Sequence, residues 1–210
     1  MTISNRINNV YNYFGTKKGL QLLSSVVLGL VLVSAGFAGY HWYSLHRTQQ
    51  AHTIFAQCMQ EFERALSSDD ASLWTDVERA FATGYKSYPR TAIAPYFLAF
   101  QAEALIHQDK QEEARVLFAD AVKKISKSSP LYYLYATKLA LMNMDTQLLT
   151  KLADDHKNSY RDMALYYLGY CAFVANDRDT AEKTWARLVR EQGNSSVWAN
   201  LAQAKLEYSA

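Results

Sequence analysis

A long apolar stretch near the N-terminus is the first feature of the hydrophobic pattern. Residues 19–43 contain no Asp, Glu, Lys or Arg. At about 1.5 Å per residue, a helix of this length measures about 37 Å, enough to cross a hydrocarbon core of about 30 Å. Tyr40, Trp42 and Tyr43 gather at its C-terminal end, where aromatic rings favour the lipid–water boundary. The pattern predicts a transmembrane helix over residues 19–43.

From residue 48 onward the apolar positions follow a helical period that short polar turns interrupt, with no sustained period-two alternation. Helices are predicted at residues 48–67, 71–87, 92–107, 110–126, 129–143, 145–156, 161–175, 177–191 and 195–208. Pro130 suits the first turn of a helix, Gly193 suits a helix stop, and Ser159 with Asp162 predicts a capping box. The chain is therefore predicted to be all-α, with four helical hairpins and a last helix that covers the apolar end of the stack.

The hairpins repeat along the chain. Ala114 and Phe118 correspond to Ala181 and Trp185, which lie 67 positions later, or two units of about 34 residues. Small side chains are expected where the two helices of a hairpin come closest, namely at Ala102, Ala136 and Gly169. Large side chains are expected to fill the space between successive hairpins, namely Phe81, Phe118, Leu152 and Trp185.

This pattern resembles the tetratricopeptide repeat, which Leu168-Gly169, Ala181 and Trp185 match best. The resemblance covers residues 48–210 and implies an α-solenoid in which the first helix of each hairpin lines a concave face. The third unit departs from the repeat, because Leu148 stands in place of the small residue and its second helix is short.

Charge sets the expected orientation. Arg6, Lys17, Lys18 and Arg47 are the only charged side chains before Glu61. Because basic residues favour the cytoplasmic side, residues 1–18 are predicted to be a cytoplasmic tail, and residues 48–210 a periplasmic or otherwise extracytoplasmic domain of an inner-membrane protein. The rest of the chain carries 18 basic and 20 acidic side chains. This balance lacks the basic surface that phosphate binding needs, so no nucleic-acid partner is expected.

A cleaved signal peptide is the alternative to an anchor. The small residues Gly36 and Ala38 flank Phe37 as a cleavage site would require. The apolar stretch is longer than the usual 7–15 residues of a signal peptide, however, and aromatic residues follow it. These features favour an uncleaved signal-anchor helix.

Candidate chemistry is sparse. The sequence has no nucleophile elbow, zinc-protease helix, phosphate loop or dinucleotide fingerprint, so an enzyme, a cofactor and a metal site are not expected. Cys58 and Cys171 are the two cysteines, and they fit best as small apolar packing residues. A disulfide between them would require the fold to bring them together.

A binding surface is the better expectation. In the register that the repeat implies, eight residues line the concave groove: Tyr96, Glu103, His107, Tyr133, Thr137, Tyr166, Tyr170 and Phe173. Tyrosine offers a large contact area at low entropic cost, which suits the binding of varied peptides. The alternative is that these rings fill the inner layer of the solenoid. The Lys/Asn clamp with which some tetratricopeptide domains hold a C-terminal carboxylate is absent at these positions, which disfavours that type of adaptor.

The layout of a basic tail, one span and a repeat domain resembles the bacterial inner-membrane tetratricopeptide-repeat family of ancillary Sec translocon subunits. The resemblance is carried by Lys17-Lys18, by Trp74, Phe81 and Gly84-Tyr85, and by Tyr160-Arg161-Asp162 with Leu165 and Leu168-Gly169. It implies association with Sec translocon subunits and a periplasmic chaperone, and help for unfolded secreted chains. Two alternatives remain: a scaffold of a cell-envelope assembly for division, secretion or pili, and a regulator that sequesters one partner.

Overall fold

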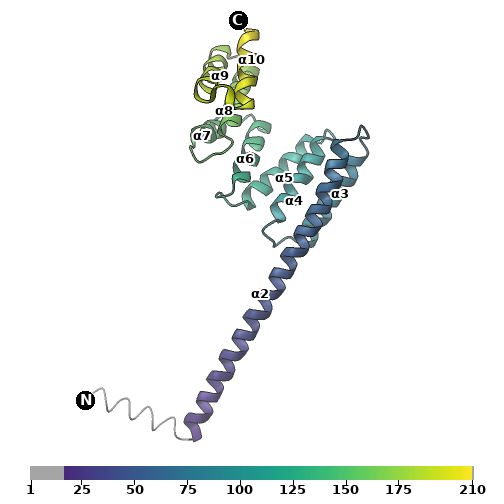
Figure 1. The fold of residues 1–210 in the computed structure, drawn as a ribbon, viewed down its shortest axis with the longest axis vertical. Coiled ribbons are helices and arrows are strands. Elements are labelled where there is room, and N and C mark those ends of the chain that lie inside the picture. Colours follow the sequence, from purple (N-terminus) through teal and green to yellow (C-terminus); the bar gives the residue numbers. More distant parts are fainter. Residues whose placement is uncertain (1–16, 210) are drawn as a thin grey trace, which may run out of the picture. The chain divides into compact units, whose positions relative to one another are not determined.

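The computed structural model describes residues 17–209, and this part of the chain is all-helical, without a β-strand. The α-helices are α2 (Lys17–Leu66), α3 (Leu73–Ser87), α4 (Ala94–Ile106), α5 (Gln111–Lys124), α6 (Pro130–Met142), α7 (Thr146–Asp154), α8 (Arg161–Val174), α9 (Arg178–Gln192) and α10 (Val197–Ser209), with a 3₁₀ turn, η1, at Gly193–Ser195. The all-α prediction is confirmed. Figure 1 shows the order of these helices along the chain.

The chain divides into two units, Met1–Gln50 and Ala51–Ala210. Helix α2 contributes to both, so the helix predicted over residues 48–67 is the last part of a single 50-residue helix. Within the described residues, no helix combines the length and the apolar composition needed to cross a membrane. The predicted tail at residues 1–18 lies almost entirely outside the described residues. The predicted span at residues 19–43 lies within α2, and the side chains of residues 19–24, 26 and 27 are not described.

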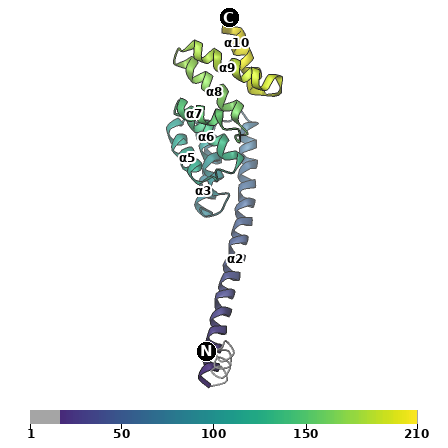
Figure 2. The same ribbon diagram turned by 90° about the vertical axis from the view of Figure 1, so that its left-hand side faces the viewer.

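In the unit Ala51–Ala210 each helix from α3 to α10 packs against the next one along the chain. Contacts also join α6 to α8 and α8 to α10, so alternate helices lie side by side. Figure 2 shows α8, α9 and α10 as one group. This arrangement is an α-solenoid of helical hairpins.

Three of the hairpin turns share one backbone conformation. Asp109, Met144 and Asn176 all adopt the left-handed region, with φ of 60°, 51° and 65°. In each turn the next residue donates its N–H to a carbonyl five positions back, for example Asp177 to Ala172 at 2.9 Å. This hydrogen bond is typical of a Schellman helix end. The three turns are 35 and 32 residues apart, so the backbone repeats with the period that the sequence predicts.

The core consists of three clusters, each shared by consecutive helices. The first joins α2, α3 and α4 around Phe81, whose ring centroid lies 6.3 Å from that of Phe97. The second joins α4, α5 and α6 around Phe118. The third joins α6 to α10 around Trp185. The large residues expected between the hairpins are all buried there, at exposures of 5% or less.

Small residues occupy the close approaches between helices, as predicted. Ala102 and Ala136 are buried. A Cβ atom at Gly169 would lie 2.5 Å from Nε1 of Trp185, so only glycine fits beside this ring. Gly84 has a similar constraint, since a Cβ there would lie 2.2 Å from the Phe97 ring.

Two local predictions need correction. The capping box at Ser159 and Asp162 is not formed, because α8 begins after Tyr160 without a side-chain cap. Asp162 instead accepts a hydrogen bond from the hydroxyl of Ser196, 34 residues later. The last helix, α10, does bury Ala199 and Ala202 against the stack. It nevertheless leaves other apolar side chains on its outer face exposed, so the predicted cap is incomplete.

Candidate functional site

The eight predicted groove residues lie on or directly after α4, α6 and α8, the first helices of three hairpins. Tyr96 and Glu103 lie on α4, and His107 follows that helix. Tyr133 and Thr137 lie on α6. The remaining three, Tyr166, Tyr170 and Phe173, lie on α8. The structure gives these residues different environments from one helix to the next.

On α4 the predicted side chains are engaged by neighbouring helices. The hydroxyl of Tyr96 lies 3.3 Å from that of Ser129, just before α6. The carboxylate of Glu103 forms an ion pair with Lys138 of α6. His107 stacks on Trp74 of α3, with ring centroids 3.8 Å apart and planes within 5°. These contacts join hairpins to one another.

On α6 the hydroxyls of the two predicted residues form hydrogen bonds within the chain. Thr137 has an exposed fraction of 0%, and its hydroxyl donates to the carbonyl of Tyr133 at 2.8 Å. Thr137 therefore offers no surface to a partner. The Tyr133 hydroxyl donates to Oδ2 of Asp155 at 2.9 Å. This hydrogen bond to a carboxylate raises the pKa of Tyr133. The polar end of the ring is thus already bound within the chain.

On α8 the environment changes, because apolar side chains reach the surface. Tyr166 is half-buried between Trp185 and Trp198, with ring centroids 6.3 and 5.4 Å away. Tyr170 and Phe173 are exposed by 39% and 42%, and Val174 beside them by 55%. Residues three and four positions apart on a helix lie on one face. We call Tyr170, Phe173 and Val174 the α8 apolar face.

Val174 was missed by the sequence reasoning, although its spacing of four from Tyr170 was a usable signal. Met144 was missed too. Met144 lies in the turn before α7 and is 42% exposed. The thiol of Cys171 of α8 donates a hydrogen bond to its Sδ at 3.8 Å. A methionine in the left-handed region is unusual, because a Cβ atom is disfavoured there. Met144 thus contacts, through its thioether, the helix that carries the α8 apolar face.

The sequence of α8 explains why this face exists. From Leu165 to Val174 the helix carries only apolar residues and tyrosine. Leu165 and Cys171 turn inward, and Gly169 admits the Trp185 ring from α9, whose Nε1 donates to the carbonyl of Tyr166 at 3.1 Å. With the inner positions filled in this way, Tyr170, Phe173 and Val174 are left exposed on the solvent side of the helix.

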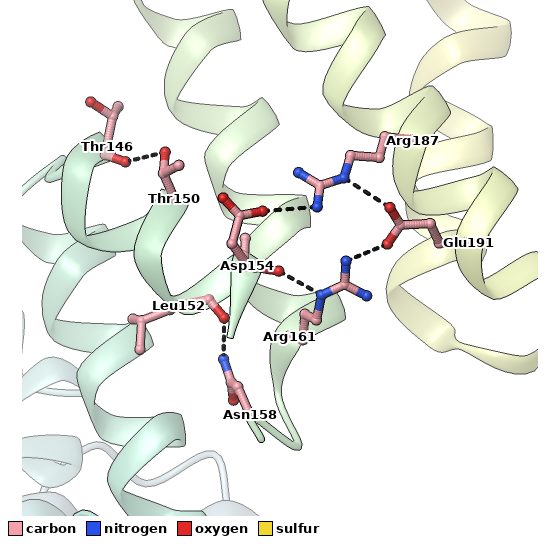
Figure 3. Close-up of polar contacts among 9 residues, drawn as sticks. Thr146, Thr150, Leu152, Asp154, Asn158, Arg161, Arg187 and Glu191 are labelled. Atoms are coloured by element: carbon pink, nitrogen blue, oxygen red, sulfur yellow. Dashed lines mark hydrogen bonds and ion pairs between the residues drawn. The ribbon is translucent and has the colours of Figure 1, made fainter. Parts of the chain in front are cut away.

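A network of charged side chains fixes α8 between its neighbours (Figure 3). Arg187 of α9 donates to Asp154 at 2.8 Å and to Glu191 at 2.9 Å. Arg161, the first residue of α8, reaches the other oxygen of Glu191 at 2.6 Å and donates to the carbonyl of Ala153 at 2.6 Å. The hydrogen bond from Arg187, assisted by the charge of Arg161, lowers the pKa of Glu191. The network joins α7, α8 and α9.

The two cysteines are free thiols in different parts of the core. Cys58 belongs to the cluster of α2, α3 and α4, and Cys171 to that of α6 to α10. Burial, with the nearby charge of Glu61, raises the pKa of Cys58 to about 11, and burial also raises the pKa of Cys171. Since the thiolate is the reactive form, both side chains act as packing residues at neutral pH.

Other concave features do not coincide with the predicted groove. A cleft of about 420 Å³ lies between α2 and α3, and Ile54, Cys58, Ala80 and Gly84 contribute to its lining. None of the eight predicted residues lines it. Within the part of the chain that the structure describes, no three His, Cys, Asp or Glu side chains come together as metal ligands would. The α8 apolar face is therefore the candidate site. Its exposed apolar side chains could form a contact surface for apolar segments of another protein.

Comparison with protein family models, curated proteins and solved structures finds no match to this chain.

Proposed function

We propose that the protein is a membrane-anchored, non-catalytic binding module of the tetratricopeptide-repeat type, which receives apolar segments of other proteins on its α8 apolar face. The observation that carries this proposal is the contrast between the first helices of the hairpins. The polar groove residues of α4 and α6 are satisfied within the chain, whereas Tyr170, Phe173 and Val174 of α8 are exposed and apolar.

The anchor belongs to the same proposal. Residues 19–43 carry no charged side chain, and the described apolar side chains of this stretch are exposed, such as Leu28 at 61%, Val33 at 71% and Phe37 at 72%. Exposing apolar area to water costs about 25 cal/mol per Å², so this surface needs an apolar environment. A lipid bilayer would supply one. Arg6, Lys17 and Lys18 precede the stretch and Arg47 alone follows it, and this excess of basic residues on the N-terminal side favours a cytoplasmic N-terminus.

The cellular role that best accords with this layout is an ancillary one at the Sec translocon, together with a periplasmic chaperone. An anchored binding face beside an exit channel raises the effective concentration of the face for emerging segments without any catalytic group. Unfolded secreted chains expose the apolar segments that such a face would bind.

The test is photocrosslinking in cells, with a photoreactive residue placed singly at Tyr170 or Phe173 of the full chain. Val116 is the matched control, because it is an apolar residue of α5 that is 60% exposed. We expect adducts from the two α8 positions and few from Val116, with channel subunits, a chaperone or secreted chains as the captured proteins. Equal capture at all three positions would refute a binding role for α8. Adducts with a division, secretion or pilus complex would replace the translocon role by the scaffold alternative.

A further inference from the structure

Met144 occupies a turn position where the backbone favours other residues. It lies in the left-handed region between α6 and α7, and the equivalent positions of the other two turns carry Asp109 and Asn176. Aspartate and asparagine adopt this conformation more readily than most residues with a side chain. The conformation of the turn therefore does not account for a methionine at this position.

The thioether of Met144 lies at the boundary between the core and solvent. Its side chain is 42% exposed, whereas Cys171, whose thiol donates to Sδ of Met144 at 3.8 Å, is 2% exposed. Val174 of the α8 apolar face follows Cys171 by three positions, so the two residues are neighbours on the surface of α8. Met144 is thus accessible to solutes at one edge of the α8 apolar face.

The other methionines that the structure describes are less accessible. Met59 and Met142 are half-buried, and Met163 is 4% exposed. Because oxidation of methionine follows exposure, an oxidant in solution reacts with Met144 first. The neighbouring thiol competes weakly, since burial raises the pKa of Cys171 and keeps it protonated at neutral pH.

We propose that Met144 is an oxidation site that regulates the α8 apolar face, with hydrogen peroxide as the oxidant. A lone pair of the sulfur attacks one peroxide oxygen, so that an S–O bond forms while the O–O bond breaks. The other oxygen leaves as water with both protons, and the two electrons that the sulfur loses are gained by the peroxide. The product is methionine sulfoxide, a polar side chain in place of an apolar one.

The polar oxygen changes what the edge of the face can bind. An apolar segment that covers the sulfoxide removes it from water without offering a donor, and a thiol such as that of Cys171 is only a weak donor. The oxidised chain should therefore hold apolar segments about fourfold more weakly, the factor that corresponds to one methylene group fewer buried on binding. This step rests on the proposed function of the α8 apolar face.

The first measurement is the order of oxidation along the chain. The full chain in lipid nanodiscs is treated with hydrogen peroxide, and the added oxygen is located by mass spectrometry of fragmented peptides. We expect Met144 to oxidise about tenfold faster than the buried Met163, with Met59 and Met142 between them. Oxidation of Met144 no faster than that of Met163 would overturn the proposal.

The second measurement is the capture of a permanently unfolded probe protein, with alkylated thiols, by a photoreactive residue at Tyr170 in the same nanodiscs. The peroxide is removed before the probe is added. We expect capture to fall about fourfold after oxidation. It should recover after treatment with methionine sulfoxide reductases of both epimer specificities and a thiol reductant.

Met144→Leu is the matched control, because leucine is apolar but has no sulfur to oxidise. Its capture should not respond to peroxide, although every other methionine is still present. Met144→Gln is polar like the sulfoxide and should capture weakly without any oxidant. Leucine and glutamine are unbranched at Cβ, as methionine is, so neither adds strain to the turn.

The outcomes separate this inference from the proposed function. If the chain without peroxide does not capture the probe, the binding role of the α8 apolar face is wrong, and its regulation with it. If that chain captures the probe, the regulatory role alone is overturned by capture that persists with Met144 fully oxidised, or that falls equally in the Met144→Leu chain.

Discussion

At the residue scale, the fold depends on glycines that leave room for a large aromatic ring of the next helix. Gly169 of α8 and Trp185 of α9 are the clearest pair, because the space of the glycine's absent Cβ is occupied by the indole. Trp185 is 1% exposed, and its Nε1 is held by the carbonyl of Tyr166. The ring is therefore buried, and its nitrogen is fixed by a hydrogen bond. Gly84 and Phe97 repeat the arrangement at the other end of the stack.

Gly169→Ala is expected to destabilise the repeat unit. Overpacking of a filled core costs about 1–3 kcal/mol, whereas alanine gains up to about 1 kcal/mol over glycine within a helix, so a net loss of about 1 kcal/mol results. Urea unfolding followed by tryptophan fluorescence measures the change. In a Trp185→Phe background the smaller ring leaves room for the methyl group, and the same substitution is expected to cost less. An equal loss in both backgrounds would exclude the contact with Trp185 as the cause.

At the scale of elements, helices α7, α8 and α9 are joined by the charge network as well as by apolar packing. Arg187 and Arg161 share the carboxylate of Glu191, and the Arg161 and Glu191 side chains are only 18% and 28% exposed. Arg161 also binds the last turn of α7 through the Ala153 carbonyl. Charge-assisted hydrogen bonds of this kind stabilise the fold, and they also restrict the angle between the helices that they join. The network therefore sets how α8 presents its apolar face.

The network predicts a specific acid sensitivity. Because the folded pKa of Glu191 is lowered, its contribution to stability is fully present above the pKa of an unfolded glutamate, about 4.3, and is lost as the pH falls through the folded value. Glu191→Gln should destabilise the unit by roughly 1 kcal/mol at pH 7, since the partly exposed carboxylate is screened by water. The difference between the two proteins should shrink as the pH falls through the lowered pKa of Glu191 and vanish below it. Unfolding free energies measured across this range check the prediction, and a difference that does not change with pH would contradict it.

At the scale of the whole molecule, the proposed function assigns different roles to the two units, Met1–Gln50 and Ala51–Ala210. The first unit contributes the apolar stretch at residues 19–43 and its basic flanks. The second contributes the solenoid with the α8 apolar face. The proposed role at the translocon requires that the second unit lie outside the cytoplasm and remain attached to the first.

Topology is therefore a direct test. A reporter enzyme that folds only outside the cytoplasm, fused after Ala210, should be active. Deletion of residues 19–43 is the control and should abolish the activity, because the fusion then stays in the cytoplasm. The mass of the membrane-extracted chain should correspond to the uncleaved protein. An inactive fusion would contradict the orientation, and a chain beginning after Ala38 would show a cleaved signal peptide instead of an anchor.

The sequence by itself determined the all-α class and the place of nearly every helix, because apolar periodicity, first-turn proline and glycine stops act over a few residues. It also placed the small and large packing residues, such as Gly169 and Trp185, since these follow the repeat. Only the tertiary structure decided which groove side chains are free. Tyr133 is bound to Asp155, 22 residues away, and Glu103 to Lys138, 35 residues away. Asp162 likewise accepts a hydrogen bond from Ser196, 34 residues away. Such contacts depend on how hairpins stack, and the exposed face of a helix is whatever that stacking leaves uncovered.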